Sequence, residues 1–205
     1  MSIERGRDWG QRGRPPATLQ VFDDPLDALD AISTARRAGT APPPIGLTAG
    51  DLVSTLGGPT TAYDLAGAEE ALNVRVDLGA ALIDGTLHWF LSHLVARRSW
   101  LRGRVLIVAN AAFLGPWNIA PRAHPGDGLL DVLDTTALSV SDRWAARRRM
   151  GNGTHIPHPA ITVRRPSAAQ YQFERALPVR LDGRLVGPAR SLSVRVEPAA
   201  VDLWI

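Results

Sequence analysis

The chain has 205 residues, 45% of them hydrophobic, a formal net charge of +3 and no cysteine. This length can bury a sizeable core, and the lack of cysteine excludes disulfides and thiolate metal sites. All of its basic residues are arginine, which excludes a P-loop or Schiff-base lysine, and the small net charge indicates no nucleic-acid surface. We therefore expect a cytoplasmic protein that binds no nucleic acid and, lacking an apolar run of membrane-spanning length, makes at most peripheral membrane contact.

The first 72 residues predict a disordered tail followed by a small α/β part. Residues 1–17 are rich in Arg, Gly and Pro, a composition typical of disordered segments. Asp24 and Pro25 favour a helix start, and Gly39 favours its end. The expected elements are a strand at Thr18–Phe22, this first helix, a strand at Ile45–Leu47 and a helix from Asp51 to Gly57. They are too few for a self-standing doubly wound sheet.

Residues 73–205 predict an antiparallel β-sandwich, because many short strands alternate with turn signals. Asp84-Gly85 and Asp182-Gly183 separate apolar runs, which favours tight hairpins. One helix is expected at Val140–Met150, with arginines at its C-terminal end. His88 and His93 fall in one expected strand, an odd number of residues apart, and so on opposite faces. The expected strands are Val74–Ile83, Thr86–Val95, Arg104–Ala109, Leu129–Thr135, Ile161–Arg164, Gln170–Glu174, Pro178–Leu181, Ser191–Val196 and Val201–Trp204.

The stretch from Asn110 to Val132 carries the most specific motif. After Asn110 it contains Gly-Pro-Trp-Asn-Ile-Ala-Pro at 115–121 and Pro-Gly-Asp-Gly-Leu-Leu-Asp-Val at 125–132. This stretch resembles a signature of the bacterial diacylglycerol/sphingosine lipid kinase family, and the similarity continues through Leu177–Gly183. Ile45–Gly58 looks like a shortened nucleotide-contacting segment of that family, in which Gly50 and Asp51 remain. The resemblance implies an α+β fold, with a reduced α/β nucleotide-domain remnant at 18–72 and a diacylglycerol-kinase-like β-sandwich at 73–205.

Three departures from the family pattern argue against phosphate transfer from ATP. The family's Gly-Gly-Asp-Gly-Thr loop, which approaches the nucleotide phosphates, has no counterpart in this sequence. The family carries a late Asp-Gly-Glu hairpin, whose glutamate is assigned a catalytic role. In this sequence the corresponding residue is Arg184, and arginine cannot act as a general base. A helix and strands that members carry before Val105 are missing. We therefore expect a degenerate member without ATP-dependent kinase activity.

Two aspartates and a histidine are the catalytic candidates. Asp127 and Asp131 bracket the Pro-Gly-Asp-Gly turn and resemble the family's acidic pair near a structural magnesium site, so Mg²⁺ or Ca²⁺ is the alternative to a capped turn without metal. His155 forms a His-x-x-His pair with His158 on a Pro-rich loop, where packing is the alternative to zinc. We expect no bound cofactor, with Mg²⁺ as the alternative.

Aromatic and polar side chains near the deletion predict an apolar ligand pocket, with core packing as the alternative for its tryptophans. The expected pocket residues are Trp89, His93, Asn110, Trp117 and Asn118, with Trp100 nearby. Arginines are the candidates for binding anions, with a solvated helix face as the alternative. They are Arg143, Arg147, Arg148 and Arg184.

Three functions from different classes are compatible with these features. The favoured one is a repurposed family member that binds or transforms a hydrophobic or amphipathic small molecule, for instance in bacterial specialised metabolism. The second is an active lipid kinase that uses ATP and Mg²⁺. The third is a non-catalytic partner subunit of another enzyme. A homodimer is a further option that the sequence leaves open.

Overall fold

The N-terminal part has the predicted strand-helix-strand-helix order. In the computed structural model, which describes residues 10–58, 64–135 and 138–205, it comprises β2 (Gln20–Phe22), α1 (Pro25–Arg37), β3 (Ile45–Leu47) and α2 (Asp51–Thr55). Asp24 caps α1, because its Oδ1 accepts the Leu26 N–H at 2.8 Å. β2 pairs in parallel with β3, and β3 pairs in parallel with the end of β13 (Arg184–Trp204). The short α/β part is thereby joined to the large sheet.

The prediction of a disordered tail over residues 1–17 is wrong in its described part. Gly10–Gly13 forms β1, which pairs antiparallel with the start of β4 (Ala71–Ile83). A polar, Gly-rich composition does not reveal this pairing, because the hydrogen bonds come from a strand some 60 residues away in the sequence. Residues 1–9 lie outside the described residues.

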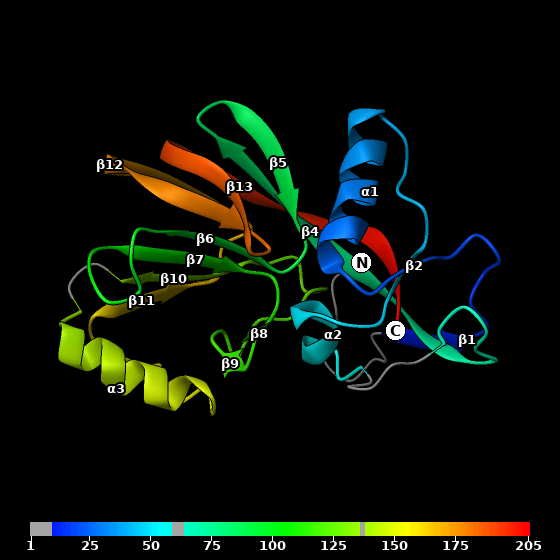
Figure 1. Cartoon of the computed structure of the whole chain (residues 1–205), viewed down its shortest axis with the longest axis horizontal. Helices are drawn as coiled ribbons and strands as arrows, with labels where there is room; N and C mark the ends of the chain where they lie inside the picture. The colour runs from blue at the N-terminus through cyan, green and yellow to red at the C-terminus, as the bar shows by residue number, and fades with distance from the viewer. Residues whose placement is uncertain (1–9, 59–63, 136–137) are drawn as a thin grey trace.

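One curved sheet folds over into a two-layered β-sandwich, as Figure 1 shows, and this confirms the predicted fold class. The first layer contains β5 (Thr86–Phe90), β4, β13 and β12 (Ala168–Leu181). The second contains β6 (His93–Arg97), β7 (Val105–Ala109), β10 (Asp131–Thr135) and β11 (Ile161–Arg164). β12 pairs with both β13 and β6, so it joins the two layers.

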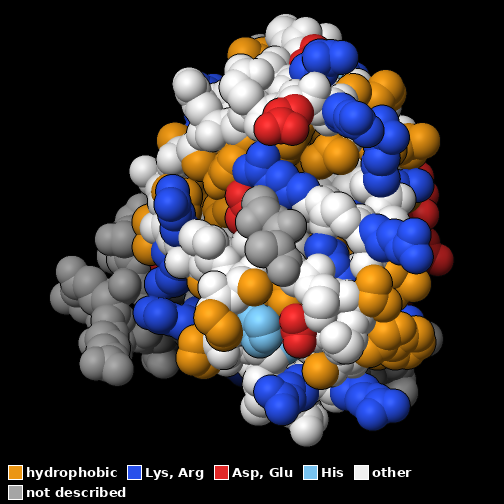
Figure 2. Space-filling model, turned by 90° about the vertical axis from the view of Figure 1, so that its left-hand side faces the viewer, with side chains coloured by type: hydrophobic (Ala, Val, Ile, Leu, Met, Phe, Trp, Pro, Cys, Tyr) orange, Lys and Arg blue, Asp and Glu red, His pale blue; other side chains and the backbone are white. Residues whose placement is uncertain are grey.

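α3 (Val140–Met150) has the predicted bounds and lies beneath the second layer, at the lower left of Figure 1. Ser139 caps it by accepting the Asp142 N–H at 3.1 Å. Next to it lies the short hairpin of β8 (Phe113–Leu114) and β9 (Trp117–Asn118). The end of the molecule that carries α3 presents many arginine side chains between apolar patches (Figure 2). No helix in the described parts of the chain is long and apolar enough to cross a membrane.

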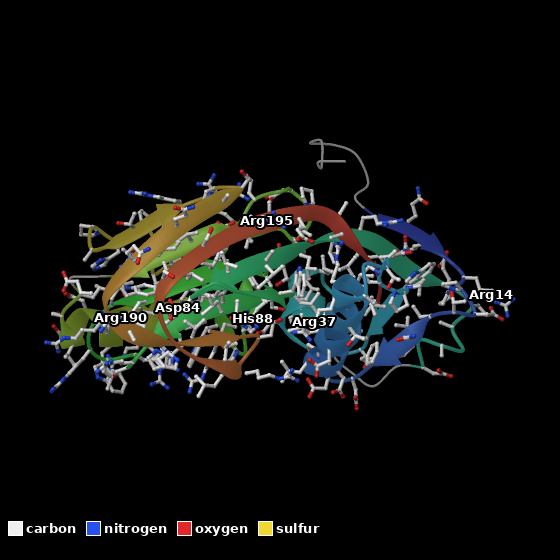
Figure 3. All side chains as sticks on the ribbon, turned by 90° about the horizontal axis from the view of Figure 1, so that it is seen from above. Arg14, Arg37, Asp84, His88, Arg190 and Arg195 are labelled. Carbon is white, nitrogen blue, oxygen red and sulfur yellow. The ribbon has the colours of Figure 1, made fainter. Side chains whose placement is uncertain are left out.

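The predicted strand Thr86–Val95 is wrong, because the chain leaves one layer and enters the other at Leu91 and Ser92. β5 pairs with β4, whereas β6 pairs with β7 and β12. The prediction that His88 and His93 occupy opposite faces of one strand is therefore also wrong. His88 lies beside Arg37 of α1 (Figure 3), and burial together with the Arg37 charge lowers the pKa of His88.

Two pairs of predicted strands are joined in the structure. Gln170–Glu174 and Pro178–Leu181 both belong to β12, whose register shifts between Gln172 and Leu177. Ser191–Val196 and Val201–Trp204 both belong to β13, whose register shifts between Glu197 and Val201. Prolines and polar residues mark these positions as turns in the sequence, but here they form bulges that bend a continuous strand.

Both predicted Asp-Gly hairpin turns are confirmed. Asp84 and Gly85 have φ of 44° and 88°, and Asp182 and Gly183 have φ of 47° and 88°, the positive values that a type I′ turn requires. The exposed Asp84 carboxylate lies next to Arg190 (Figure 3) and accepts the N–H groups of Arg190 and Ser191. Each turn aspartate therefore forms contacts beyond its own hairpin, as shown for Asp182 below.

Alternation along the strands divides the apolar side chains between two faces of the second layer. The inward residues fill the sandwich interior, which includes Phe90, Leu94, Leu106, Val108, Val132 and Val179. The outward residues form a second cluster under α3 and the segment after β7, which includes Val95, Val105, Ile107, Leu133 and Ile161. A third cluster packs α1 and α2 against β3 and β4. The outward face is therefore apolar and needs a cover, which α3 supplies in part.

Substitution of Gly79 tests how tightly the first layer is packed. Gly79 lies directly opposite the fully buried Phe90, and a Cβ at this position would lie 2.2 Å from the Phe90 ring. Gly79→Ala should lower the free energy of unfolding by about 1–3 kcal/mol, because the ring must move within a packed core. Denaturant unfolding measures the change. In the control Gly13→Ala, where nothing lies within 4 Å of the new Cβ, the change should stay within about 0.5 kcal/mol. Equal stability of Gly79→Ala and wild type would contradict this packing.

Candidate functional site

Asp182 fixes the place where the chain crosses between the layers. Its carboxylate accepts the backbone N–H groups of Leu91, Ser92 and His93 at 2.7, 2.8 and 2.7 Å. Burial raises the pKa of Asp182 to about 6, against the three N–H donors that favour the ionised form. The carboxylate is therefore ionised at pH 7 and holds the β5–β6 connection in place.

Asn110 and Asp77 extend this buried polar network. The Asn110 side-chain amide donates to the carbonyls of Asp77 and Leu91 at 2.9 and 2.8 Å. The Asp77 carboxylate accepts the N–H groups of Gly128 and Ala199 at 2.7 and 2.8 Å. Asn110 is 1% exposed, so this predicted pocket residue instead joins the end of β7 to β4 and to the β5–β6 connection, while Asp77 holds the Pro-Gly-Asp-Gly loop.

His93 and Asp51 meet at the junction of the α/β part and the sandwich. His93 is 1% exposed, its Nε2 lies 3.0 Å from the Ala111 carbonyl, and its Nδ1 lies 3.6 Å from an Asp51 oxygen. Burial lowers the pKa of His93 to about 4, so the ring is neutral at pH 7 and Nε2 donates to the carbonyl. The close approach is therefore no ion pair at pH 7. The other Asp51 oxygen accepts the Gly115 N–H at 2.8 Å, which ties α2 to the turn between β8 and β9.

An apolar pocket lies between α3 and the outward face of the second layer. Its empty space is about 810 Å³ when the open mouth is counted. The floor is formed by strand residues, and tryptophans and helix residues form the walls. The lining includes Trp100, Val105, Ile107, Trp117, Leu133 and Ala146.

Besides Thr135, three polar side chains belong to the pocket lining. Arg143 donates to the carbonyls of Leu138 and Trp100 at 3.2 Å each, and also to that of Gly103, so it holds the loop between β6 and β7. Arg147 lies over the ring of Trp117, 5.4 Å from its centroid. His155 is 3% exposed, with Nε2 bonded to the Ile119 carbonyl at 3.0 Å and Nδ1 without a partner. Burial lowers the pKa of His155.

The predicted pocket residues are separated in the structure. Trp117 lines the pocket, as does Trp100. Trp89 packs into the cluster of α1 and α2 instead. His93 and Asn110 belong to the buried polar network, and Asn118, on β9, is not part of the lining. A ligand site at these residues thus stays a prediction, and most of the lining of the observed pocket comes from strands and from α3.

Arg165 pairs with both aspartates of the Pro-Gly-Asp-Gly motif. Its guanidinium donates to Asp131 at 3.0 Å, to Asp127, and to the Arg122 carbonyl at 3.2 Å. Burial raises the pKa of Asp131, and the pairing with Arg165 opposes that rise. Within the described residues, no group of three or more His, Asp or Glu side chains is arranged to hold a metal ion. Arg165 thus supplies a positive charge beside the carboxylates where Mg²⁺ or Ca²⁺ was the alternative to a turn without metal.

The four predicted anion-binding arginines do not form one site. Arg184 donates to the Asp30 carboxylate of α1 at 2.6 and 3.0 Å. Arg143 is occupied by carbonyls, as described above. Arg147 lies at the pocket, and Arg148 is exposed on α3. Arg143 and Arg147 both line the pocket, and of these two only Arg147 is not bonded to backbone carbonyls.

The chain is similar to known proteins in sequence and in fold. Residues 71–205 match the family described as the YegS C-terminal NAD kinase beta sandwich-like domain. The chain belongs to this family. A structure from Bacillus anthracis strain Sterne, described as a proposed diacylglycerol kinase, is similar with a TM-score of 0.68 and 14% identity, over 91% of this chain and 77% of that one. A second structure from the same strain, described as a diacylglycerol kinase, has a TM-score of 0.58 and 14% identity, over 79% of this chain and 66% of that one. No curated protein sequence matches.

The YegS-like sandwich confirms the lipid-kinase resemblance that the motif at Asn110–Val132 indicated. The position of the family's glutamate is occupied by Arg184, whose charge is matched by Asp30. Gly50 and Asp51 precede and begin α2, and Asp51 is bound to Gly115. Arg184 and Asp51 therefore both have partners within the protein.

Sequence reasoning missed the residues that hold this region together. Asp182 was used as a turn signal, and its bonds to the β5–β6 connection were not anticipated. Asp77 offered a usable signal, because a charged residue between Val76 and Leu78 in an apolar strand must have buried partners. Arg165 offered none, since the sequence does not show that it lies beside Asp127.

His93→Gln should change the pH dependence of stability. His93 has a folded pKa of about 4 against an ordinary value of 6.5, so its contribution to stability is present above pH 6.5 and is lost as the pH falls toward 4. Glutamine can still donate to the Ala111 carbonyl but does not titrate, so up to about 3 kcal/mol of this loss should disappear. Asp182, with its raised pKa, acts in the opposite direction over the same interval, because its contribution falls as pH rises toward 6. Urea unfolding of both proteins from pH 4 to 7.5 isolates the His93 difference, and identical profiles would contradict it.

Proposed function

We propose that this protein is a lipid-kinase-like family member without ATP-dependent kinase activity, which binds a hydrophobic or amphipathic small molecule in the pocket under α3. The pocket itself carries the proposal. Its walls are almost entirely apolar, with tryptophans at the loop and at the β8–β9 hairpin. Large rigid aromatic rings and branched side chains are typical of sites that bind apolar ligands. The cytoplasmic location expected from the sequence is part of this proposal.

The pocket lies at the loop before Val105, where the family resemblance implies a missing helix and strands. This position supports a ligand-binding role acquired with that deletion. Trp100 and Leu101 belong to the short loop between β6 and β7, and both line the pocket. Leu101 is 40% exposed, so the loop leaves apolar surface open at the mouth. A longer insertion at this loop would lie next to the same surface.

The ion pair at the position of the family's catalytic glutamate supports the proposed lack of phosphate transfer. Arg184 is paired with Asp30 where the family resemblance implies a glutamate. Phosphoryl transfer requires a base near the acceptor hydroxyl and groups that offset the charge of the triphosphate. His93 is fully buried, and Asp51 already accepts the Gly115 N–H.

Binding of uncharged C12 amphiphiles tests the pocket. Native mass spectrometry and titration calorimetry with 1-dodecanol and dodecyl maltoside should show a saturable complex. Ala146→Phe should abolish it, because Ala146 is 5% exposed and lines the pocket. The matched control Val140→Phe, on the exposed side of the same helix, should bind as wild type does. Absence of any complex with the wild-type protein would overturn the proposal.

A radiolabelled-ATP assay tests the other half of the proposal. With diacylglycerol, sphingoid and polyprenol acceptors, we expect no transfer of phosphate above background in the presence of Mg²⁺. Asp127→Ala serves as the control for contaminating kinases, because their background would not change with this substitution. Sustained Mg²⁺-dependent turnover that Asp127→Ala removes would establish an active lipid kinase instead.

A further inference from the structure

Two arginines lie side by side on the outward face of the second layer. Arg97 is directly opposite Val105 of β7, and Arg180 is directly opposite Val95 of β6. Because Val95 and Arg97 are two residues apart on one strand, both arginines project from the same face as Val95 and Val105. The charge of Arg180 also acts on Arg97, which together with burial lowers the Arg97 pKa. By strand register, the two arginines are therefore diagonal neighbours on adjacent strands.

Neither arginine has an acidic partner among the described residues. The other partly buried guanidinium groups are balanced by carboxylates or carbonyls, as in Arg104 with Asp134 and Arg165 with Asp131. Arg97 instead has a buried Nε without any hydrogen-bond partner, and Arg180 is half-buried without an ion pair. Two like charges in such surroundings are unfavourable until an anion lies between them.

The arginine pair adjoins the α3 pocket. The Arg97 guanidinium stacks on the Trp100 ring, 3.9 Å from its centroid, and Trp100 lines the pocket. Val105, the partner of Arg97 in the sheet, lines it as well. The stacking on Trp100 orients the planar guanidinium and leaves its edge as the donor surface. The apolar pocket therefore lies next to two arginines that have no acidic partner among the described residues.

We propose that Arg97 and Arg180 bind the anionic head group, a carboxylate or a phosphate monoester, of an amphiphile whose apolar part occupies the pocket under α3. This inference rests on the proposed function and adds the charge and orientation of the ligand. Guanidinium groups bind both kinds of oxyanion through paired N–H donors, and they stay charged at all physiological pH values. Arg147, over Trp117 on another side of the pocket, is not required for this contact.

Titration calorimetry with probes of one chain length tests the inference. The probes are dodecyl phosphate, dodecanoate, uncharged 1-dodecanol and inorganic phosphate, the last to distinguish a free anion from a head group. Wild type should bind both anionic amphiphiles more tightly than 1-dodecanol, and inorganic phosphate much more weakly than dodecyl phosphate. Arg97→Gln and Arg180→Gln should each weaken dodecyl phosphate binding by about tenfold and leave 1-dodecanol binding unchanged. Arg175→Gln, which removes an equal charge from an exposed position on β12, should leave both affinities unchanged.

The outcomes separate this inference from the function on which it rests. If anionic and uncharged probes bind wild type equally, or if Arg97→Gln and Arg180→Gln bind dodecyl phosphate as wild type does, the head-group site is overturned while the pocket stands. Inorganic phosphate binding as tightly as dodecyl phosphate would replace it with a free-anion site. If no C12 probe binds at all, the proposed function itself fails. Circular dichroism of each variant ensures that lost binding is not lost folding.

Discussion

The contact on which the rest of the structure depends is the Asp182 carboxylate with the N–H groups of Leu91, Ser92 and His93. At this point the chain leaves the layer of β5 and enters the layer of β6, so these N–H groups have no neighbouring strand to bond. A buried carboxylate costs free energy, and it is tolerated here because three donors surround it. The direction of β6, and with it the whole outward face of the second layer, follows from this contact.

The same principle explains why the lipid-kinase motif is retained in a chain that lacks the family's phosphate loop. Asn110 bonds the backbone of β4 and of the β5–β6 connection, and Asp77 bonds the backbone of the Pro-Gly-Asp-Gly loop. Arg165 neutralises Asp127 and Asp131 at the other side of that loop. These three side chains thus satisfy backbone groups or charges that would otherwise be buried alone. The motif therefore has a structural role that does not require nucleotide.

The outward face of the second layer is where structure and proposed function meet. Strand alternation makes this face apolar, and the short β6–β7 loop and α3 cover it only in part, which leaves the pocket. Among the described residues, Arg104 and Arg165 are paired with carboxylates, whereas Arg97 and Arg180 have no acidic partner. An anionic amphiphile would complement the charge of these arginines beside the apolar pocket, as proposed above. The arrangement thus links the pocket to the proposed ligand class.

The sequence by itself determined the features that depend on local chemistry. The bounds of α3, the Asp24 cap of α1 and both Asp-Gly turns follow from a few adjacent residues, and the family motif followed from a continuous stretch. Only the tertiary structure decided the crossing at Leu91 and Ser92, the pairing of β1, and the separation of Trp89 from Trp117. The juxtaposition of Arg97 with Arg180 also depended on register between strands some 80 residues apart. These features depend on long-range contacts and buried hydrogen bonds, and local sequence patterns carry no information about which distant strand will supply them.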